Sequence, residues 1–321
     1  MTKGTTIWII VAVSLILIGT IIFGGVMTVL NWDFTKLGTR NFETNTYDFE
    51  EDFENISIKS DTAKIVLELS DDEKCRVECY EDRNMKHDAV VANGILTIKV
   101  SDERKWYDHI GIYSGSAKIT VYLPKSEYAK LMIKNSTGAV EISKDIKFDD
   151  LDISLTTGSV KLYASVSNLA KIKTNTGAIF INNASLGALD LTATTGDITL
   201  SSVICQGNID IDVSTGKATL TDVGCQSLIS TGSTGNVIMS DTVASEKIDI
   251  KRSTGSVTLD SCDAGEIVIK TDTGSVRGTL LSEKVFIAHS DTGRVSVPKT
   301  TNGGRCEITT DTGSIKIQIR E

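Results

Sequence analysis

The segment LMIKNSTGAVEI, residues 131–142, alternates apolar and polar residues on both sides of a Thr-Gly pair. The same pattern recurs every 19 or 20 residues, ten times in all. Apolar residues lie five and seven positions before each glycine and two and four positions after it, with Ser230 and Gly278 as the exceptions. The repeated glycines are Gly138, Gly158, Gly177, Gly196, Gly216, Gly235, Gly255, Gly274, Gly293 and Gly313.

Alternation with a period of two indicates β-strands, so each repeat holds two short strands. The glycine between them marks a corner, because it adopts backbone shapes that residues with a β-carbon resist. Units of this length stack on their own copies, each burying the apolar face of the next. The sequence therefore predicts an all-β fold, a parallel β-solenoid of about ten 19–20-residue rungs. An antiparallel meander is compatible with the same alternation.

Residues 7–30 form an uncharged run rich in Ile, Val and Leu. At about 1.5 Å per residue, a helix of this length spans a bilayer core of about 30 Å. A cleaved signal peptide is the alternative, but the run is longer than such segments usually are and no small-x-small cleavage pattern follows it closely. We expect a single-pass transmembrane helix at residues 7–30, a cytoplasmic tail at residues 1–6 and an extracellular solenoid.

The rest of the chain divides by composition. Residues 31–46 are polar and suit a tether. Residues 47–130 alternate without Thr-Gly pairs and are expected to form a β-rich cap over the first rung, and residues 131–321 hold the solenoid repeats. An uncovered last rung exposes unpaired backbone groups. Since only charged residues such as Lys316 and Arg320 protect it, self-association through the C-terminal rung is expected.

Charge and cysteine usage exclude several kinds of site. The net charge is −9 and no Lys/Arg cluster occurs, which argues against a nucleic-acid partner. The six cysteines include no C-x-x-C motif and no His/Cys pair at metal-ligand spacing, so we predict no metal and no cofactor. Cys75, Cys79 and Cys306 are interpreted as core residues. Cys205 and Cys225 should stack on adjacent rungs, either as a disulfide or as two buried thiols.

Two groups of residues are candidates for binding. Trp106, Tyr107 and Tyr113 form a dense aromatic group, which would serve either as a recognition loop or as packing between the cap and the first rung. A second group, Asp190, Asp210 and Asp212, should project from neighbouring rungs. These carboxylates would act as acid and base, hold a cation, or form an ordinary solvated face.

Catalytic motifs are weak in this chain. The D-T-G-S sequences that begin at Asp272 and Asp311 match the loop of aspartic proteases, but the repeat explains them better, since Ser, Thr or Asn takes the Asp position in most other rungs. Asp272, Asp291 and Asp311 should stack over three rungs, where a bound cation is a minor alternative. The three histidines are far apart in sequence and have no obvious nucleophile partner. We therefore predict no catalytic residues.

The run Ile119-Thr-Val-Tyr-Leu-Pro124, the segment at residues 131–142 and the repeated Thr-Gly-x-Val-x-Leu resemble a bacterial family of β-strand-repeat domains of unknown function known as "putative adhesins". The resemblance covers roughly residues 47–321, with a membrane helix in front as in many members. It implies a right-handed β-solenoid at the cell envelope, in some relatives beside envelope-stress signalling systems. It supplies no catalytic residues.

These observations favour a non-enzymatic, membrane-anchored module that binds or adheres through its surface to wall polymer, glycan or another envelope protein. The first alternative is a cytoplasm-facing scaffold that polymerises end to end in the manner of bactofilins. The second alternative is a polysaccharide-cleaving β-helix enzyme that uses Asp190, Asp210 and Asp212. The repeat itself does not discriminate among ligands, because it reflects packing.

Overall fold

The computed structural model describes residues 3–33, 42–102 and 116–320 and contains one helix followed by strands. The elements are α1 (Lys3–Val29), β1 (Phe42–Phe49), β2 (Asn55–Ser60), β3 (Lys64–Leu69), β4 (Cys75–Asp82), β5 (Met85–Ala92), β6 (Ile95–Asp102), β7 (Lys118–Leu123), β8 (Glu127–Thr137), β9 (Val140–Ile142), β10 (Lys147–Thr157), β11 (Val160–Leu162), β12 (Ser165–Thr176), β13 (Ile179–Thr195), β14 (Ile198–Cys205), β15 (Ile209–Thr215), β16 (Ala218–Thr234), β17 (Val237–Thr254), β18 (Val257–Thr273), β19 (Val276–Leu280), β20 (Lys284–Thr292), β21 (Val295–Ser296), β22 (Gly304–Thr312) and β23 (Ile315–Ile319).

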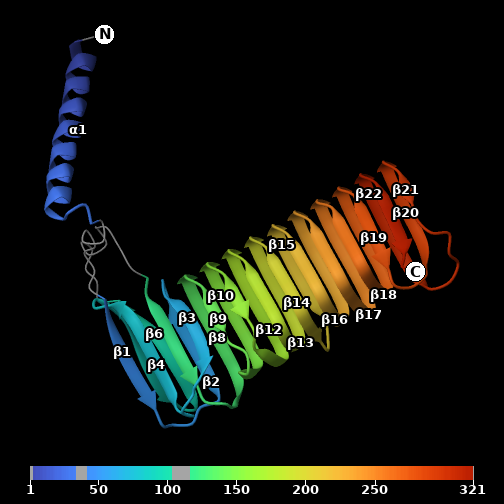
Figure 1. The fold of residues 1–321 in the computed structure, drawn as a ribbon, viewed down its shortest axis with the longest axis horizontal. Coiled ribbons are helices and arrows are strands. Elements are labelled where there is room, and N and C mark those ends of the chain that lie inside the picture. The colour runs from blue at the N-terminus through green and yellow to red at the C-terminus, as the bar shows by residue number, and fades with distance from the viewer. Residues whose placement is uncertain (1–2, 34–41, 103–115, 321) are drawn as a thin grey trace.

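The strands coil into one long column (Figure 1), and equivalent residues of successive rungs lie side by side in register. Val160, for example, pairs with Val140 on one side and with Ile179 on the other, in parallel strands. The apolar positions of the repeat point inward and form one continuous buried core. The predicted fold, a parallel β-solenoid of about ten turns, is confirmed.

The Thr-Gly corner is built from stacked backbones. Gly216 has φ +151°, and a β-carbon there would lie only 2.1 Å from the carbonyl oxygen of Gly196. The Gly216 amide donates a hydrogen bond to the carbonyl of Thr234 on the next rung, at 2.9 Å. Any side chain at this position would therefore enter the backbone of the neighbouring rung.

A second corner, which the sequence analysis missed, lies six residues after the glycine in five consecutive rungs. Its residues adopt left-handed conformations with φ between +47° and +55°. Asn, Asp and Ser are common in turns because their side chains hydrogen-bond locally. The residues are Asn183, Ser202, Asp222, Asp241 and Ser261.

At the C-terminal end, the spatial order of the rungs differs from their order in the chain. Strand β22 pairs with β18 on one side and with β20 on the other, and β23 pairs with β19 and β21 in the same way. The last rung of the sequence thus fills a gap one level inside the column (Figure 1). The expectation that the C-terminal rung is the uncovered end is wrong, because β20 and β21 occupy that place.

The N-terminal end shows a similar exchange. Strands β2 and β3 lie between the rung of β6 and β7 and the rung of β8 and β9, so parallel stacking extends to β2, β3, β6 and β7. Strand β4 adds to β7 in antiparallel orientation, β1 adds to β4, and β5 adds to β6. The β4–β5 hairpin thereby joins two faces of the column and closes its N-terminal end.

Helix α1 is long and apolar enough to cross a membrane, and the hydrophobic window within it is not buried against the rest of the protein. Most of its Ile, Val and Leu side chains are exposed. A signal sequence near the N-terminus can also be long and apolar enough to form such a helix. The predicted apolar helix near the N-terminus is therefore present, at Lys3–Val29.

Candidate functional site

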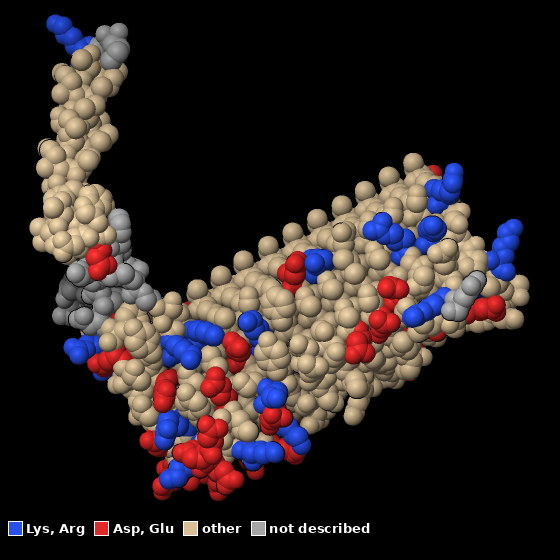
Figure 2. Space-filling view, viewed as in Figure 1, with Lys and Arg blue, Asp and Glu red and all other residues tan. Residues whose placement is uncertain are grey.

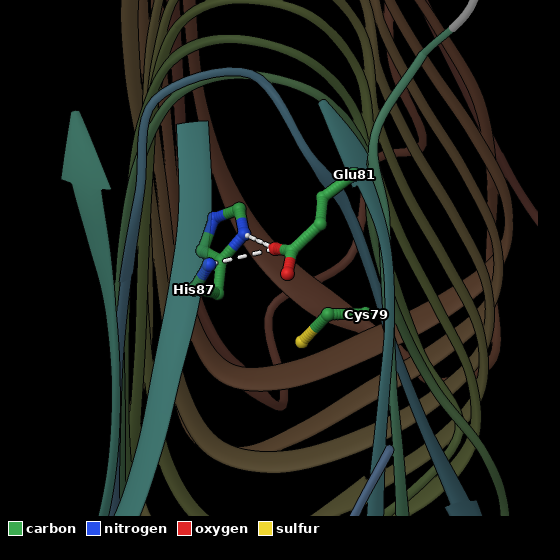
Figure 3. Close-up of side chains that lie close together, drawn as sticks. All are labelled: Cys79, Glu81 and His87. Atoms are coloured by element: carbon green, nitrogen blue, oxygen red, sulfur yellow. Dashed lines mark hydrogen bonds and ion pairs between the residues drawn. The ribbon is translucent and has the colours of Figure 1, made fainter. Parts of the chain in front are cut away.

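The most unusual group of side chains lies inside the N-terminal cap (Figure 3). Cys79 and Glu81 are two residues apart on β4, so both point to the same side of the strand, toward the interior. His87 faces them from β5. Each of the three residues is 0% exposed, and one potential ligand atom from each lies within 4.8 Å of the others.

Hydrogen bonds fix the orientation of this cluster. His87 Nδ1 lies 2.6 Å from Glu81 Oε2, and the His87 amide donates to the same oxygen at 2.7 Å. Glu81 Oε1 accepts a hydrogen bond from Asn45 Nδ2 of β1 at 2.8 Å. On the other side of the imidazole, Nε2 lies 2.9 Å from Ser60 Oγ of β2. The cluster therefore links four strands of the cap.

The order Glu81, His87, Ser60 is that of a hydrolytic triad, in which a carboxylate orients a histidine that activates a hydroxyl. Ser60 is only 2% exposed, so no substrate reaches its hydroxyl in this structure. The arrangement therefore acts as a structural connection between strands, and the structure gives no support to a nucleophilic function for Ser60.

The Cys79 thiol is in its protonated form at neutral pH. Burial, with a smaller contribution from the charge of Glu81, raises the pKa of Cys79 to about 12. A free thiol of this kind is a poor nucleophile. The interpretation of Cys75, Cys79 and Cys306 as core residues agrees with their burial.

This cluster was not predicted from the sequence. The histidines are far apart in sequence and no metal site was predicted, but the hairpin places His87 next to Cys79 and Glu81. The sequence does carry one signal, the alternation of inward and outward positions along each strand. Glu81 continues the inward positions of Val77 and Cys79 on β4, and His87 follows Met85 on the inward side of β5. Ionisable residues at inward strand positions are unusual and indicate a buried polar contact.

The aspartates predicted as a site are only partly brought together. Asp190 and Asp210 pair across adjacent rungs, while Asp212 lies two residues farther along and pairs with Thr192. Lys171 on the preceding rung forms an ion pair with Asp190 at 2.9 Å. Burial, together with the charge of Asp190, raises the pKa of the Asp210 carboxyl. The group is therefore a partly neutralised surface row.

The remaining candidates have different outcomes. Trp106, Tyr107 and Tyr113 lie outside the described residues. Asp272, Asp311 and Asp291 follow one another along three rungs, in that spatial order, and Asp291 contacts His289 at 2.8 Å. Cys205 and Cys225 are both free and buried.

Three recesses around the cap stand out among the described residues. That of about 500 Å³ is lined by Asp52, Glu54 and Glu127, among others. The two others are smaller. One, of about 420 Å³, is lined by several acidic residues, including Glu50, Asp52 and Glu73. The other, of about 240 Å³, is lined by Asp82, Met85 and Thr62, close in sequence to the residues of the buried cluster. None of the three recesses contains the aspartates predicted from the sequence.

Similar solved structures come from several bacteria. A "putative lipid binding protein" of Parabacteroides distasonis has 19% identity and a TM-score of 0.53, with 75% of this chain and 98% of that protein covered. A "putative adhesin" of Parabacteroides merdae has 12% identity and a TM-score of 0.45, covering 88% of this chain and 98% of that one. A "putative adhesin" of Bacteroides fragilis has 14% identity and a TM-score of 0.42, covering 87% and 98%.

The first of these similarities supports the fold. Comparison with curated proteins gives no match. Among protein families, one matches just over half of the chain, at residues 53–217, and this stretch includes the N-terminal cap and the first rungs of the solenoid. The chain therefore belongs to the Toastrack DUF4097 family.

Proposed function

We propose that this protein is a membrane-anchored, non-enzymatic envelope module that binds an extended, hydroxyl-rich polymer such as a wall polysaccharide or glycan along one edge of its solenoid. The observation that carries the proposal is a column of threonines. The threonine before each corner glycine is exposed in all ten repeats. Register pairs connect them in one row: Thr137, Thr157, Thr176, Thr195, Thr215, Thr234, Thr254, Thr273, Thr312 and Thr292.

The chemistry of this edge suits a neutral polymer. Neighbouring hydroxyls recur at about 4.8 Å, the spacing between strands, and each can donate and accept a hydrogen bond. The residue before each threonine is also exposed, and in the first seven repeats it is Ser, Thr or Asn. Charged residues gather mainly over the N-terminal cap, and the middle rungs carry fewer in the same view (Figure 2). A long row of exposed hydroxyls favours many weak contacts over one deep pocket.

The anchor is the second part of the proposal. Helix α1 exposes its apolar side chains, so insertion into a bilayer would remove this surface from water. An orientation with the solenoid outside the cell is part of this proposal. The names of the similar structures agree with a role in binding. A place beside envelope-stress signalling stays an expectation from the family resemblance.

Two measurements test the proposal. In intact cells, added protease should remove a C-terminal tag if the solenoid is outside, whereas survival of the tag until lysis would place it in the cytoplasm. For binding, the full chain in detergent is sedimented with insoluble wall polysaccharide. Thr215→Lys, in the middle of the row, should weaken binding several-fold. Ile204→Lys, at a 67% exposed position on another side of the same coil, serves as control. Equal binding by both variants and wild type would rule out the threonine row.

A polymerising scaffold is the second candidate, and one observation favours it. In the described part of the chain, no strand pairs with the outer edge of β20, where Ile287 and Val285 are exposed. Unprotected edges of this kind accept strands from other molecules. Filaments seen by electron microscopy and lost in Ile287→Lys would support this function, and a monomer at high concentration would exclude it.

The enzymatic alternative depends on the unequal environments of Asp190 and Asp210. Burial and the charge of Asp190 raise the pKa of Asp210, whereas Asp190 is paired with Lys171, and such unequal environments are typical of an acid and a base. Activity on a panel of glycans that disappears in Asp210→Asn would support cleavage. Absence of activity, or unchanged activity in that variant, would reject it.

A further inference from the structure

We propose that Cys79, Glu81 and His87 form a binding site for one Zn²⁺ ion inside the N-terminal cap. Thiolate sulfur, imidazole nitrogen and carboxylate oxygen are the ligand types that zinc prefers in proteins. The three potential ligand atoms lie within 4.8 Å of one another. Around a shared ion, zinc bond lengths place such atoms about 3–4 Å apart. Small side-chain movements, including an opening of the hydrogen bond between His87 and Glu81, therefore suffice.

The surrounding hydrogen bonds already orient two of the ligands. Ser60 Oγ lies 2.9 Å from His87 Nε2, so Nδ1 is the nitrogen directed toward Glu81. Asn45 Nδ2 holds Glu81 Oε1 at 2.8 Å, which leaves Oε2 facing the imidazole. Metal-bound histidines and carboxylates in proteins typically have such partners, which fix the tautomer and the direction of the ligand atom.

Charge in this dry interior also favours a divalent ion. Glu81 is 0% exposed, and a buried carboxylate needs a compensating positive charge. On binding, Zn²⁺ displaces the proton of the Cys79 thiol into solvent, and the ion with one thiolate, one carboxylate and a neutral imidazole then sums to zero charge. The nitrogen and sulfur ligands select a metal of the zinc type over Ca²⁺ or Mg²⁺, which prefer oxygen.

The position of the cluster gives such an ion a role. The recess of about 240 Å³ lined by Asp82 and Met85 lies at the same hairpin, while Cys79, Glu81 and His87 themselves are buried and do not line it. A bound ion would join β4 to β5 and thus hold together the two faces that the hairpin closes. Because ions that bind only the folded state stabilise it, metal loading should strengthen this end of the column.

The test uses the full chain in detergent, stripped with a chelator and then dialysed. Competition with a chelating dye should show one Zn²⁺ per chain, and Co²⁺ should give a thiolate charge-transfer band. Saturating Zn²⁺ should raise the melting temperature. Cys79→Ser should lose the band and weaken Zn²⁺ binding at least tenfold. Cys75→Ser is the matched control, because Cys75 is a buried cysteine on the same strand and is absent from the cluster.

The outcomes separate clearly. Zn²⁺ uptake that is lost in Cys79→Ser and kept in Cys75→Ser supports the site. A folded wild-type chain that takes up no Zn²⁺, or takes up the same amount after the Cys79 substitution, overturns it and leaves a hydrogen-bonded connection only. If Cys79→Ser does not fold, Glu81→Gln replaces it, since the amide keeps the size of the side chain and removes the charged ligand.

Discussion

Arg252 donates a hydrogen bond from Nη2 to Ser230 Oγ at 2.8 Å inside the solenoid. Both residues are buried, and Arg252 Nε has no partner among the described residues. Ser230 stands where the adjacent rungs carry Ile211 and Ile250. A β-carbon at Gly232 would lie 3.0 Å from Arg252 Nη1. Ser230 and Gly232 therefore leave space inside their rung, and the side chain of Arg252 from the next rung fills it.

This pair predicts a strongly non-additive set of stabilities. Ser230→Ile should restore the repeat pattern yet destabilise the protein by roughly 2–4 kcal/mol, because the larger side chain collides with the guanidinium and removes its partner. Arg252→Met keeps the length and removes the buried charge, so its effect should be small or stabilising. The double variant should recover about 1–3 kcal/mol relative to Ser230→Ile. Urea unfolding of the four proteins measures this coupling, and simple additivity would contradict the contact.

The sequence predicts the features that arise from contacts repeated in every rung, and it does not predict those that depend on a single contact between distant residues. Apolar alternation and the Thr-Gly corners identify the solenoid, because every rung repeats the same core and the same close backbone approach. The spatial order of the rungs at the two ends cannot be predicted from the sequence. Equivalent rungs have the same backbone edge, so each could pair with several others. Ser230 appears as an exception in the sequence, but its reason, Arg252, comes from another rung.

The buried cluster was hidden for a related reason. Glu81 and His87 lie on either side of a tight turn. Their side chains meet in the interior only because β4 and β5 form an antiparallel hairpin. Ser60 reaches His87 from a strand 27 residues away. Contacts of this kind depend on tertiary placement, whereas periodicity describes only the local strand.

Corner glycines should tolerate no substitution. Gly216→Ala places a β-carbon 2.1 Å from a carbonyl oxygen in a left-handed backbone, so we expect a loss of several kcal/mol or failure to fold. Gly224→Ala, on β16 of the same region, is the control, because nothing lies within 4 Å of a β-carbon built there. Thermal melting followed by circular dichroism compares the two. Similar melting temperatures would show that the corner relaxes easily.

Cross-linking can test the order of the last rungs. Val268 pairs with Glu307, and Glu307 pairs with Ile287. Adjacent strands lie about 4.8 Å apart, within the reach of a disulfide, whereas two strand spacings are too far. Val268→Cys with Glu307→Cys should therefore oxidise readily, and Val268→Cys with Ile287→Cys should not. The reverse result would mean that the rungs follow their order in the chain.

The native cysteines should be unreactive in the folded protein. All six are buried and free, and burial raises the pKa of Cys75, Cys225 and Cys306 to about 12. Since the thiolate is the reactive form, a thiol reagent at pH 8 should label the native chain very slowly. In denaturant without reductant, all six thiols should react. Only four reactive thiols would indicate a disulfide between Cys205 and Cys225, which stack on neighbouring rungs.

The same thiols predict how stability depends on alkaline pH. Their folded pKa values lie above the ordinary value of 9.0, so above about pH 9 the unfolded chain loses protons that the folded chain keeps. The contribution of the thiols to stability is therefore fully present below pH 9 and should be lost progressively from pH 9 to about pH 12. Each such thiol contributes about 1.4 kcal/mol per pH unit in that window. Cys306→Val, at a position where other rungs carry Leu or Ile, should make the fall measurably less steep in urea unfolding. An unchanged slope would mean that this thiol already ionises in the folded protein.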